Sequence, residues 1–214
     1  MLDARLRRFV DPPVNALGQS LARLGVTANQ ITLAGLLLGV AAATAIALEA
    51  YWTGLAILLV SRLMDGLDGA VARVKGKTDL GGYLDIVFDF IFYGLIPLGF
   101  AVARPENALP AAVLLTAFYA NGASFLAYAI MAEKHKLSTV SHGSKSLYFT
   151  GGLAEAGETY AVFAAFCLFP DAFAWIAYGF AAVTAITTGS RILLAVQVFG
   201  QKNTAKGGER DGAD

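Results

Sequence analysis

Six long apolar segments, separated by short polar stretches, run along this chain of 214 residues. They cover residues 28–49, 52–74, 80–103, 108–132, 153–169 and 171–198. Each is close to the roughly 20 residues that an α-helix needs to cross a hydrocarbon core of about 30 Å. If these segments were helices of a soluble protein, the chain would have too little polar surface to cover six of them. The pattern therefore predicts an all-α, polytopic membrane protein with six transmembrane helices.

The two ends of the chain follow other patterns. Between residues 2 and 23, apolar residues recur every three or four positions among arginines. This spacing predicts an N-terminal amphipathic helix that lies on the inner membrane surface, and a loosely packed terminal helix is the alternative. The last residues have the composition of a disordered tail. The predicted division is a juxtamembrane helix over 1–25, a transmembrane domain over 26–199 and a cytoplasmic tail over 200–214.

Composition narrows the classes of function. Hydrophobic residues make up 57% of the chain and charged residues only 15%, so the chain is far more apolar than a typical soluble domain. Sixteen basic and sixteen acidic residues cancel, so no net charge favours a nucleic acid as partner. The single cysteine, Cys167, has no second cysteine with which to form an internal disulfide. Because the net charge is zero, any role of charge in this protein depends on local groups of charged residues.

Basic residues predict the orientation in the membrane. They lie before the first apolar segment, between the second and third, between the fourth and fifth, and after the last. The opposite loops hold only Arg104. Because basic residues concentrate on the cytoplasmic side of membrane proteins, both termini are predicted to be cytoplasmic. The expected location is the cell (inner) membrane, which the chain crosses several times.

Four aspartates stand inside the second and third apolar segments: Asp65, Asp68, Asp85 and Asp89. A charged side chain near the centre of a membrane helix costs about 2.5 to 3.5 kcal/mol, so these carboxylates need compensation. The first two are three positions apart and the last two are four apart, so each pair projects from one face of its helix. An antiparallel helical hairpin would bring the two faces together.

Converging carboxylates without histidine or thiolate partners suit a hard divalent cation. The pattern predicts Mg²⁺ or Mn²⁺, with two ions because one would leave the cluster strongly negative. Glycines between the two pairs would let a ligand approach the backbone closely. Arg73 adds a fork of donors that suits a phosphate oxygen. Together these features predict a site for a diphosphate.

The stretch "DGLDGAVAR…GGYLDIVFD" resembles the motif of the CDP-alcohol phosphatidyltransferase family. In that motif D-x-x-D-G-x-x-A-R is followed by G-x-x-x-D-x-x-x-D. Every fixed position is matched, by Asp65, Asp68, Gly69, Ala72, Arg73, Gly81, Asp85 and Asp89. The spacer of seven residues between Arg73 and Gly81 is slightly shorter than usual in the family. This departure affects the contacts expected near the nucleotide, chiefly at Thr78.

The resemblance implies a reaction and a set of roles. Members of this family move a phosphoalcohol group from a CDP-linked donor to an alcohol acceptor and release CMP, often in phospholipid biosynthesis. The donor would be CDP-diacylglycerol or another CDP-alcohol, and a homodimer is expected. Asp65, Asp68 and Asp85 would hold the metal ions, and Asp89 would complete the cluster and act as general base. Gly69 and Ala72 would leave room for the cytidine, and Arg73 would bind a phosphate.

A second stretch, "VTANQIT", begins the first apolar segment. It is similar to an element that lines the nucleotide pocket in the same family. By that match Thr27, Ala28, Asn29 and Gln30 would contact the CDP moiety. The alternative is a helix cap, because Thr and Asn side chains satisfy the free N–H groups at a helix start.

The acceptor site is predicted on the cytoplasmic side, from the polar residues near the last two apolar segments. The candidates are Lys134, His142, Lys145, Glu155, Glu158 and Arg191. The basic members would bind a phosphorylated acceptor or the acidic lipid surface, or simply follow the rule for cytoplasmic loops. The glutamates and Arg191 are charged residues in apolar surroundings, which are functional candidates. They would pair with one another and Lys145, or line the acceptor pocket.

Two other classes of function remain open from the sequence. A membrane prenyltransferase also holds a diphosphate with Mg²⁺ and aspartates, but it normally needs a second aspartate-rich motif in a longer chain. An ion or proton carrier also uses aspartates within the membrane. A carrier gives no reason for the pattern of Gly69, Ala72 and Arg73. CMP release from CDP-diacylglycerol separates both classes from a CDP-alcohol phosphatidyltransferase.

Overall fold

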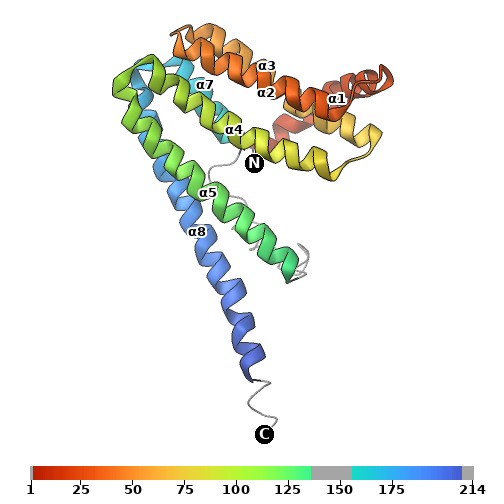
Figure 1. The fold of residues 1–214 in the computed structure, drawn as a ribbon, viewed down its shortest axis with the longest axis vertical. Helices are drawn as coiled ribbons and strands as arrows, with labels where there is room; N and C mark the ends of the chain where they lie inside the picture. Colours follow the sequence, from red (N-terminus) through yellow and green to blue (C-terminus); the bar gives the residue numbers. More distant parts are fainter. Residues whose placement is uncertain (1, 136–155, 209–214) are drawn as a thin grey trace. The chain divides into compact units, whose positions relative to one another are not determined.

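The computed structural model describes residues 2–135 and 156–208 (Figure 1). Its helices are α1 (Leu2–Arg23), α2 (Ala28–Ala47), α3 (Tyr51–Lys75), α4 (Asp79–Ala103), α5 (Ala108–Lys134), α7 (Ala156–Leu168) and α8 (Phe173–Gly208). Two short 3-10 helices, η1 (Pro105–Asn107) and η2 (Pro170–Ala172), precede α5 and α8. These residues form no strand. The predicted all-α class is thus confirmed for the described part of the chain.

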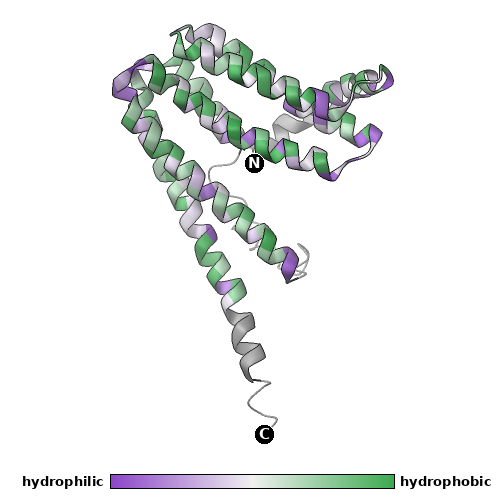
Figure 2. Cartoon of the chain, in the orientation of Figure 1, coloured by the Kyte–Doolittle hydropathy of each residue, from purple (hydrophilic) through white to green (hydrophobic). Residues whose placement is uncertain are grey.

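Each predicted apolar segment contains a helix, but the helices differ in length and polarity. Four spans among the described residues are long and apolar enough to cross a membrane: Ala28–Ala47, Asp79–Ala103, Pro105–Lys134 and Pro170–Gly200 (Figure 2). The 25-residue helix α3 carries several charged residues. The helix α7 has only 13 residues. Six membrane crossings therefore stay a prediction, with α3 and α7 as the two additional candidates.

The end of the chain differs from the prediction. Helix α8 continues to Gly208, whereas the composition predicts a disordered tail from residue 200. No proline interrupts residues 200–208, and a glycine pair occurs only at the end, so nothing in the sequence stops the helix earlier. Helical structure therefore extends past the predicted boundary at residue 200, and the cytoplasmic tail stays a prediction.

The chain divides into two compact units. One comprises Met1–Ala112 and Ala161–Ile176, and the other comprises Val113–Tyr160 and Ala177–Asp214. In the first unit, α2 packs against both α3 and α4. Small residues allow this close approach: a Cβ atom at Gly99 of α4 would lie 2.7 Å from the carbonyl oxygen of Ala43 in α2. The helix α2 therefore packs against both helices that carry the aspartates.

The N-terminal helix α1 packs against α3. Val14, Leu21 and Ala22 of α1 share an apolar cluster with Leu67 and Val71 of α3. The chain then turns at Gly25, whose φ of +92° is a left-handed conformation that glycine adopts without strain. The predicted helix over residues 2–23 is confirmed, and its position on a membrane surface stays a prediction.

Candidate active site

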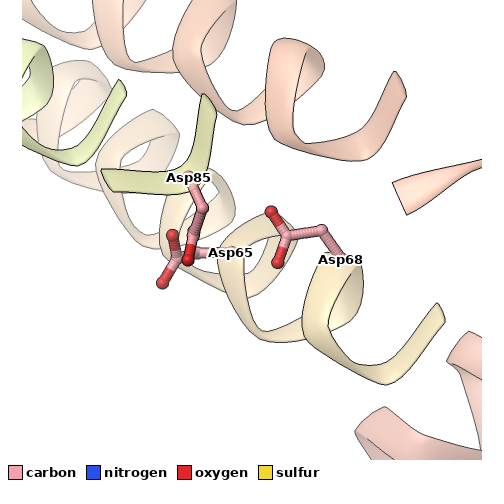
Figure 3. Close-up of side chains that lie close together, drawn as sticks. All are labelled: Asp65, Asp68 and Asp85. Carbon is pink, nitrogen blue, oxygen red and sulfur yellow. The ribbon is translucent and has the colours of Figure 1, made fainter. Parts of the chain in front are cut away.

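Acidic side chains from α3 and α4 converge beside α2. Asp65 and Asp68 project from α3 toward Asp85 of α4 (Figure 3). Each offers a carboxylate oxygen, and these three oxygens all lie within 4.8 Å of one another. Opposite oxygens in the octahedral shell of Mg²⁺ are about 4.2 Å apart. Small movements would therefore let the three carboxylates share one hard divalent ion, whereas the sequence predicts four carboxylates around two ions.

A threonine of α2 supports one of these carboxylates. The Thr32 hydroxyl lies 2.7 Å from Oδ2 of Asp68 and 2.9 Å from the carbonyl oxygen of Ala28. Asp68 and Thr32 are both buried. Since water does not surround this carboxylate, the hydroxyl donor stabilises its charge and fixes its orientation. Thr32 ends the stretch VTANQIT that resembles a nucleotide-pocket element of the family, but no local spacing relates it to Asp68 of α3.

The fourth aspartate, Asp89, lies at the same pocket but has a different partner. Nη1 of Arg62 donates a hydrogen bond to Oδ1 of Asp89 at 3.0 Å. The same nitrogen lies 3.6 Å from Oδ1 of Asp65. Arg62 was missed in the sequence, although a basic residue in an apolar segment three positions before Asp65 is a usable signal.

The pocket between these side chains is narrow. The four aspartates, Thr32 and Arg62 line it on the polar side, and Leu36 and Phe88 add apolar walls. Its free volume is about 10 Å³. A space of this size holds an ion or one water molecule but not a nucleotide. The cluster therefore fits the metal part of the predicted diphosphate site.

The predicted nucleotide residues at the start of α2 form a helix cap. The Thr27 hydroxyl accepts a hydrogen bond from the Gln30 N–H at 3.4 Å. Oε1 of Gln30 in turn accepts one from the Thr27 N–H at 2.9 Å. This reciprocal pair is a capping box, so the alternative interpretation as a cap is confirmed for Thr27. Ala28 packs against the apolar cluster formed by α1, α2 and α3.

The start of α4 lies beside the start of α2. Thr78 caps α4, and its hydroxyl accepts a hydrogen bond from the Gly81 N–H at 3.0 Å. A Cβ atom at Gly81 would lie 3.0 Å from Oγ1 of Thr78 and 3.1 Å from Oδ1 of Asn29. Two predicted nucleotide residues, Asn29 and Thr78, thus lie against the backbone of Gly81, where a larger side chain would crowd them.

The other predicted nucleotide residues lie in the second half of α3. Arg73 is exposed, and its Nη2 donates a hydrogen bond to Oδ1 of Asn15 in α1 at 2.7 Å. A Cβ atom at Gly69 would lie 3.5 Å from Nη1 of Arg73, and Ala72 is half-buried. The Arg73 guanidinium therefore lies beside Gly69. It is held there by Asn15, which the sequence pattern did not indicate.

The acceptor candidates belong to the second unit. His142, Lys145 and Glu155 lie outside the described residues. Lys134 ends α5, and Glu158 is exposed in the first turn of α7. Nothing described brings these two side chains to the acidic cluster.

Arg191 of α8 is buried and bonded to α5. Its Nη1 donates to Oδ1 of Asn121 at 2.8 Å and to Oγ of Ser124 at 3.1 Å. It lines a groove of about 490 Å³ between α5 and α8, whose other walls include Tyr128, Ile192 and Phe199. Among the described residues Arg191 is therefore held by an amide and a hydroxyl, and its predicted pairing with the glutamates stays a prediction.

Comparison with known proteins gives a consistent result. The family model described as CDP-alcohol phosphatidyltransferase matches residues 25–188. The chain is 45% identical over 193 residues to the inner membrane protein YnjF of Escherichia coli (strain K12), covering 90% of this chain and 94% of that protein. It is also 36% identical over 100 residues to an archaetidylinositol phosphate synthase of Pyrococcus horikoshii. That match covers 46% of this chain and 53% of the synthase.

Solved structures share the fold at lower identity. Phosphatidylinositol phosphate synthase (PgsA1) of Mycobacterium tuberculosis with CDP-DAG bound has a TM-score of 0.64 and 22% identity, and the match covers 86% of this chain and 93% of that one. The same synthase in complex with manganese and citrate has a TM-score of 0.67 and 22% identity, with coverages of 84% and 87%. At this identity the likeness establishes the arrangement of helices.

Proposed function

The chain belongs to the CDP-alcohol phosphatidyltransferase family, and from this premise we propose that it transfers a phosphatidyl group from CDP-diacylglycerol to an alcohol acceptor. CMP is the second product, and the reaction serves phospholipid biosynthesis. The observation that carries the proposal is the approach of Asp65, Asp68 and Asp85 to within 4.8 Å. The choice of donor is supported by the synthase of the same fold that was solved with CDP-DAG bound.

The three carboxylates would hold Mg²⁺ or Mn²⁺, because their oxygens match the ligand preference of hard divalent ions. When bound, such an ion neutralises negative charge on the diphosphate as CMP leaves. A synthase of the same fold was solved in complex with manganese. Thr32 would keep the Asp68 carboxylate turned toward the ion through its 2.7 Å hydrogen bond.

Asp89 would act as the general base. Its carboxylate takes the proton of the acceptor hydroxyl while that oxygen attacks the β-phosphorus. A new phosphorus–oxygen bond forms to the acceptor, the bond between the β-phosphorus and the bridging oxygen breaks, and CMP departs with that oxygen. Asp89 lines the metal pocket with one oxygen bonded to Arg62. This position suits a base beside the reacting phosphorus.

The CDP moiety would bind over the first turns of α2 and α4 and the second half of α3. Asn29 and Thr78 lie against the backbone of Gly81, and their polar side chains would contact the ribose or base. Arg73 would exchange its bond to Asn15 for a phosphate oxygen, since a guanidinium binds phosphate strongly. Thr27, Ala28, Gln30, Gly69 and Ala72 would shape the surrounding surface.

The acceptor would be a small, polar alcohol, bound with the help of Lys134, His142, Lys145, Glu155, Glu158 and Arg191. The permanent charge of Arg191 in the lining of a mainly apolar groove favours an acceptor that carries a phosphate. The protein would cross the inner membrane six times with both termini and the active site in the cytoplasm. A homodimer is proposed from the family alone.

A direct assay tests the proposed reaction. Purified protein in detergent is supplied with CDP-diacylglycerol, Mg²⁺ and a panel of labelled acceptors, and CMP and labelled lipid are measured. We expect CMP release that needs both Mg²⁺ and one acceptor, and that is lost in Asp85→Asn. A prenyltransferase or a carrier would release no CMP under any of these conditions, and that result would overturn the proposal.

A further inference from the structure

A partly buried arginine lies between the proposed base, Asp89, and Asp65 of the three-carboxylate cluster. The Arg62 side chain is only 12% exposed. Its Nη1 lies 3.0 Å from Oδ1 of Asp89 and 3.6 Å from Oδ1 of Asp65. The positive group therefore lies between two of the four aspartates that would otherwise share a pair of metal ions.

Contacts with α3 and α4 hold this guanidinium in place, and α2 holds one of its partners, Ser61. It stacks on the fully buried ring of Phe92 in α4, with Cζ 3.7 Å from the ring centroid. Its Nη2 donates to Oγ of Ser61 at 3.2 Å. The Ser61 hydroxyl in turn donates to the carbonyl oxygen of Gly35 in α2 at 2.8 Å. Because the arginine is packed on both its flat face and its edge, its position is set by the fold of the unit.

A second divalent ion beside Asp89 would meet this charge at close range. Such an ion would lie about 2.1 Å from an Asp89 oxygen, within a few ångströms of Nη1 of Arg62. A guanidinium keeps its proton at all physiological pH values. Repulsion between two cations at that distance is strong in a partly buried site. Arg62 already supplies one positive charge to the four carboxylates. A second ion is therefore less necessary to neutralise their negative charge.

We propose that Arg62 replaces a second divalent ion, so that the site binds one ion through Asp65, Asp68 and Asp85. Asp89 is then a carboxylate free of metal, held by Arg62 and available to take a proton. This inference rests on the metal site of the proposed function. It replaces the expectation of two ions from the sequence, which counted the four aspartates without Arg62.

The test counts bound metal without turnover. Mn²⁺ is titrated into the purified full-length protein in detergent, and bound ions are counted by electron paramagnetic resonance. Ions that persist in Asp85→Asn are subtracted as background. We expect one ion in the wild type, with a mononuclear signal. We expect two ions in Arg62→Met, with the spectrum of two spin-coupled Mn²⁺ ions about 3.5–4 Å apart.

Arg104→Met is the matched control. Arg104 also contacts two carboxylates, with Nε 3.3 Å from Oε2 of Glu49 and Nη1 2.5 Å from Oδ1 of Asp171, but it follows the far end of α4. Its variant should bind one ion, like the wild type.

Several results would overturn the inference. Two ions in the wild type would do so even if Arg62→Met did not fold. One ion in a folded Arg62→Met variant would show that Arg62 does not set the count, and two ions in Arg104→Met would show that the effect is not local. Two wild-type ions with normal CMP release would reject this inference alone. One ion without CMP release from any acceptor would reject the proposed reaction alone.

Discussion

Single side chains from different helices decide how the acidic cluster is built. Asp68 is buried and receives the hydroxyl of Thr32, which belongs to α2 rather than to its own helix. Loss of a hydrogen-bond donor destabilises a buried carboxylate more than an exposed one, because water cannot replace the hydrogen bond. The donor should therefore matter for metal binding as well as for folding.

Thr32→Val tests this contact with almost no change in volume. We expect Mg²⁺ to bind about 10–100-fold more weakly, because the carboxylate loses the donor that orients it. The measurement is the Mg²⁺ dependence of CMP release, together with Mn²⁺ titration. Thr44→Val is the matched control on the same helix, since that hydroxyl donates only to the carbonyl oxygen of Val40. Unchanged metal affinity in Thr32→Val would contradict the supporting role.

Asp89→Asn tests the proposed base. The rate at saturation should fall by about 10²–10⁴-fold, because the amide cannot take a proton, while binding of CDP-diacylglycerol should be largely kept. Rates of CMP release and donor binding are measured side by side. Glu106→Gln, at an exposed position in η1 beyond the other end of the same helix, should leave both unchanged. Weaker binding with a normal saturated rate would remove Asp89 from the base role.

Helix packing brings these side chains together. The first unit uses α2 as its centre, and glycines at the contacts allow the backbones to approach closely. Gly35 of α2 faces Met64 of α3, and Gly39 faces the ring of Phe92 in α4. The small-residue spacing in this segment thus serves packing within the chain.

Gly99→Ala tests the contact between α2 and α4. The added methyl would lie 2.7 Å from the carbonyl oxygen of Ala43, a backbone atom that cannot move aside easily. We expect a loss of about 1–3 kcal/mol in the free energy of unfolding, as for other overpacked cores. Gly94→Ala on the same helix meets nothing within 4 Å, so it should be neutral or slightly stabilising. Thermal unfolding in detergent measures the stability of both variants. Equal stability of the two would contradict the close contact between α2 and α4 at Gly99.

At the scale of the whole molecule, the orientation in the membrane remains to be tested. The positive-inside rule predicts that the loop between α3 and α4 is cytoplasmic and that the loop after α4 is external. The apolar length of α4 is sufficient for one crossing between them.

Cysteine labelling gives a direct answer, because the chain has one native cysteine, Cys167, which is buried. In a Cys167→Ala background, Glu106→Cys and Lys77→Cys place one thiol on each side of α4, both at exposed positions. An impermeant maleimide should label the first in intact cells and the second only after permeabilisation. The reverse pattern would invert the orientation, and labelling of both from outside would mean that α4 does not cross.

The sequence alone determined where most helices lie and which aspartates form the acidic cluster. Apolar length and a period of 3.6 residues are local properties, so they placed the helix α2 and predicted that Asp65 and Asp68 share a face. The tertiary structure alone decided which side chains meet across helices. Arg62 contacts Asp89, Thr32 contacts Asp68, and Asn15 contacts Arg73 because of the way helices rotate and pack. Those rotations depend on contacts between residues far apart in the chain, which no local spacing encodes.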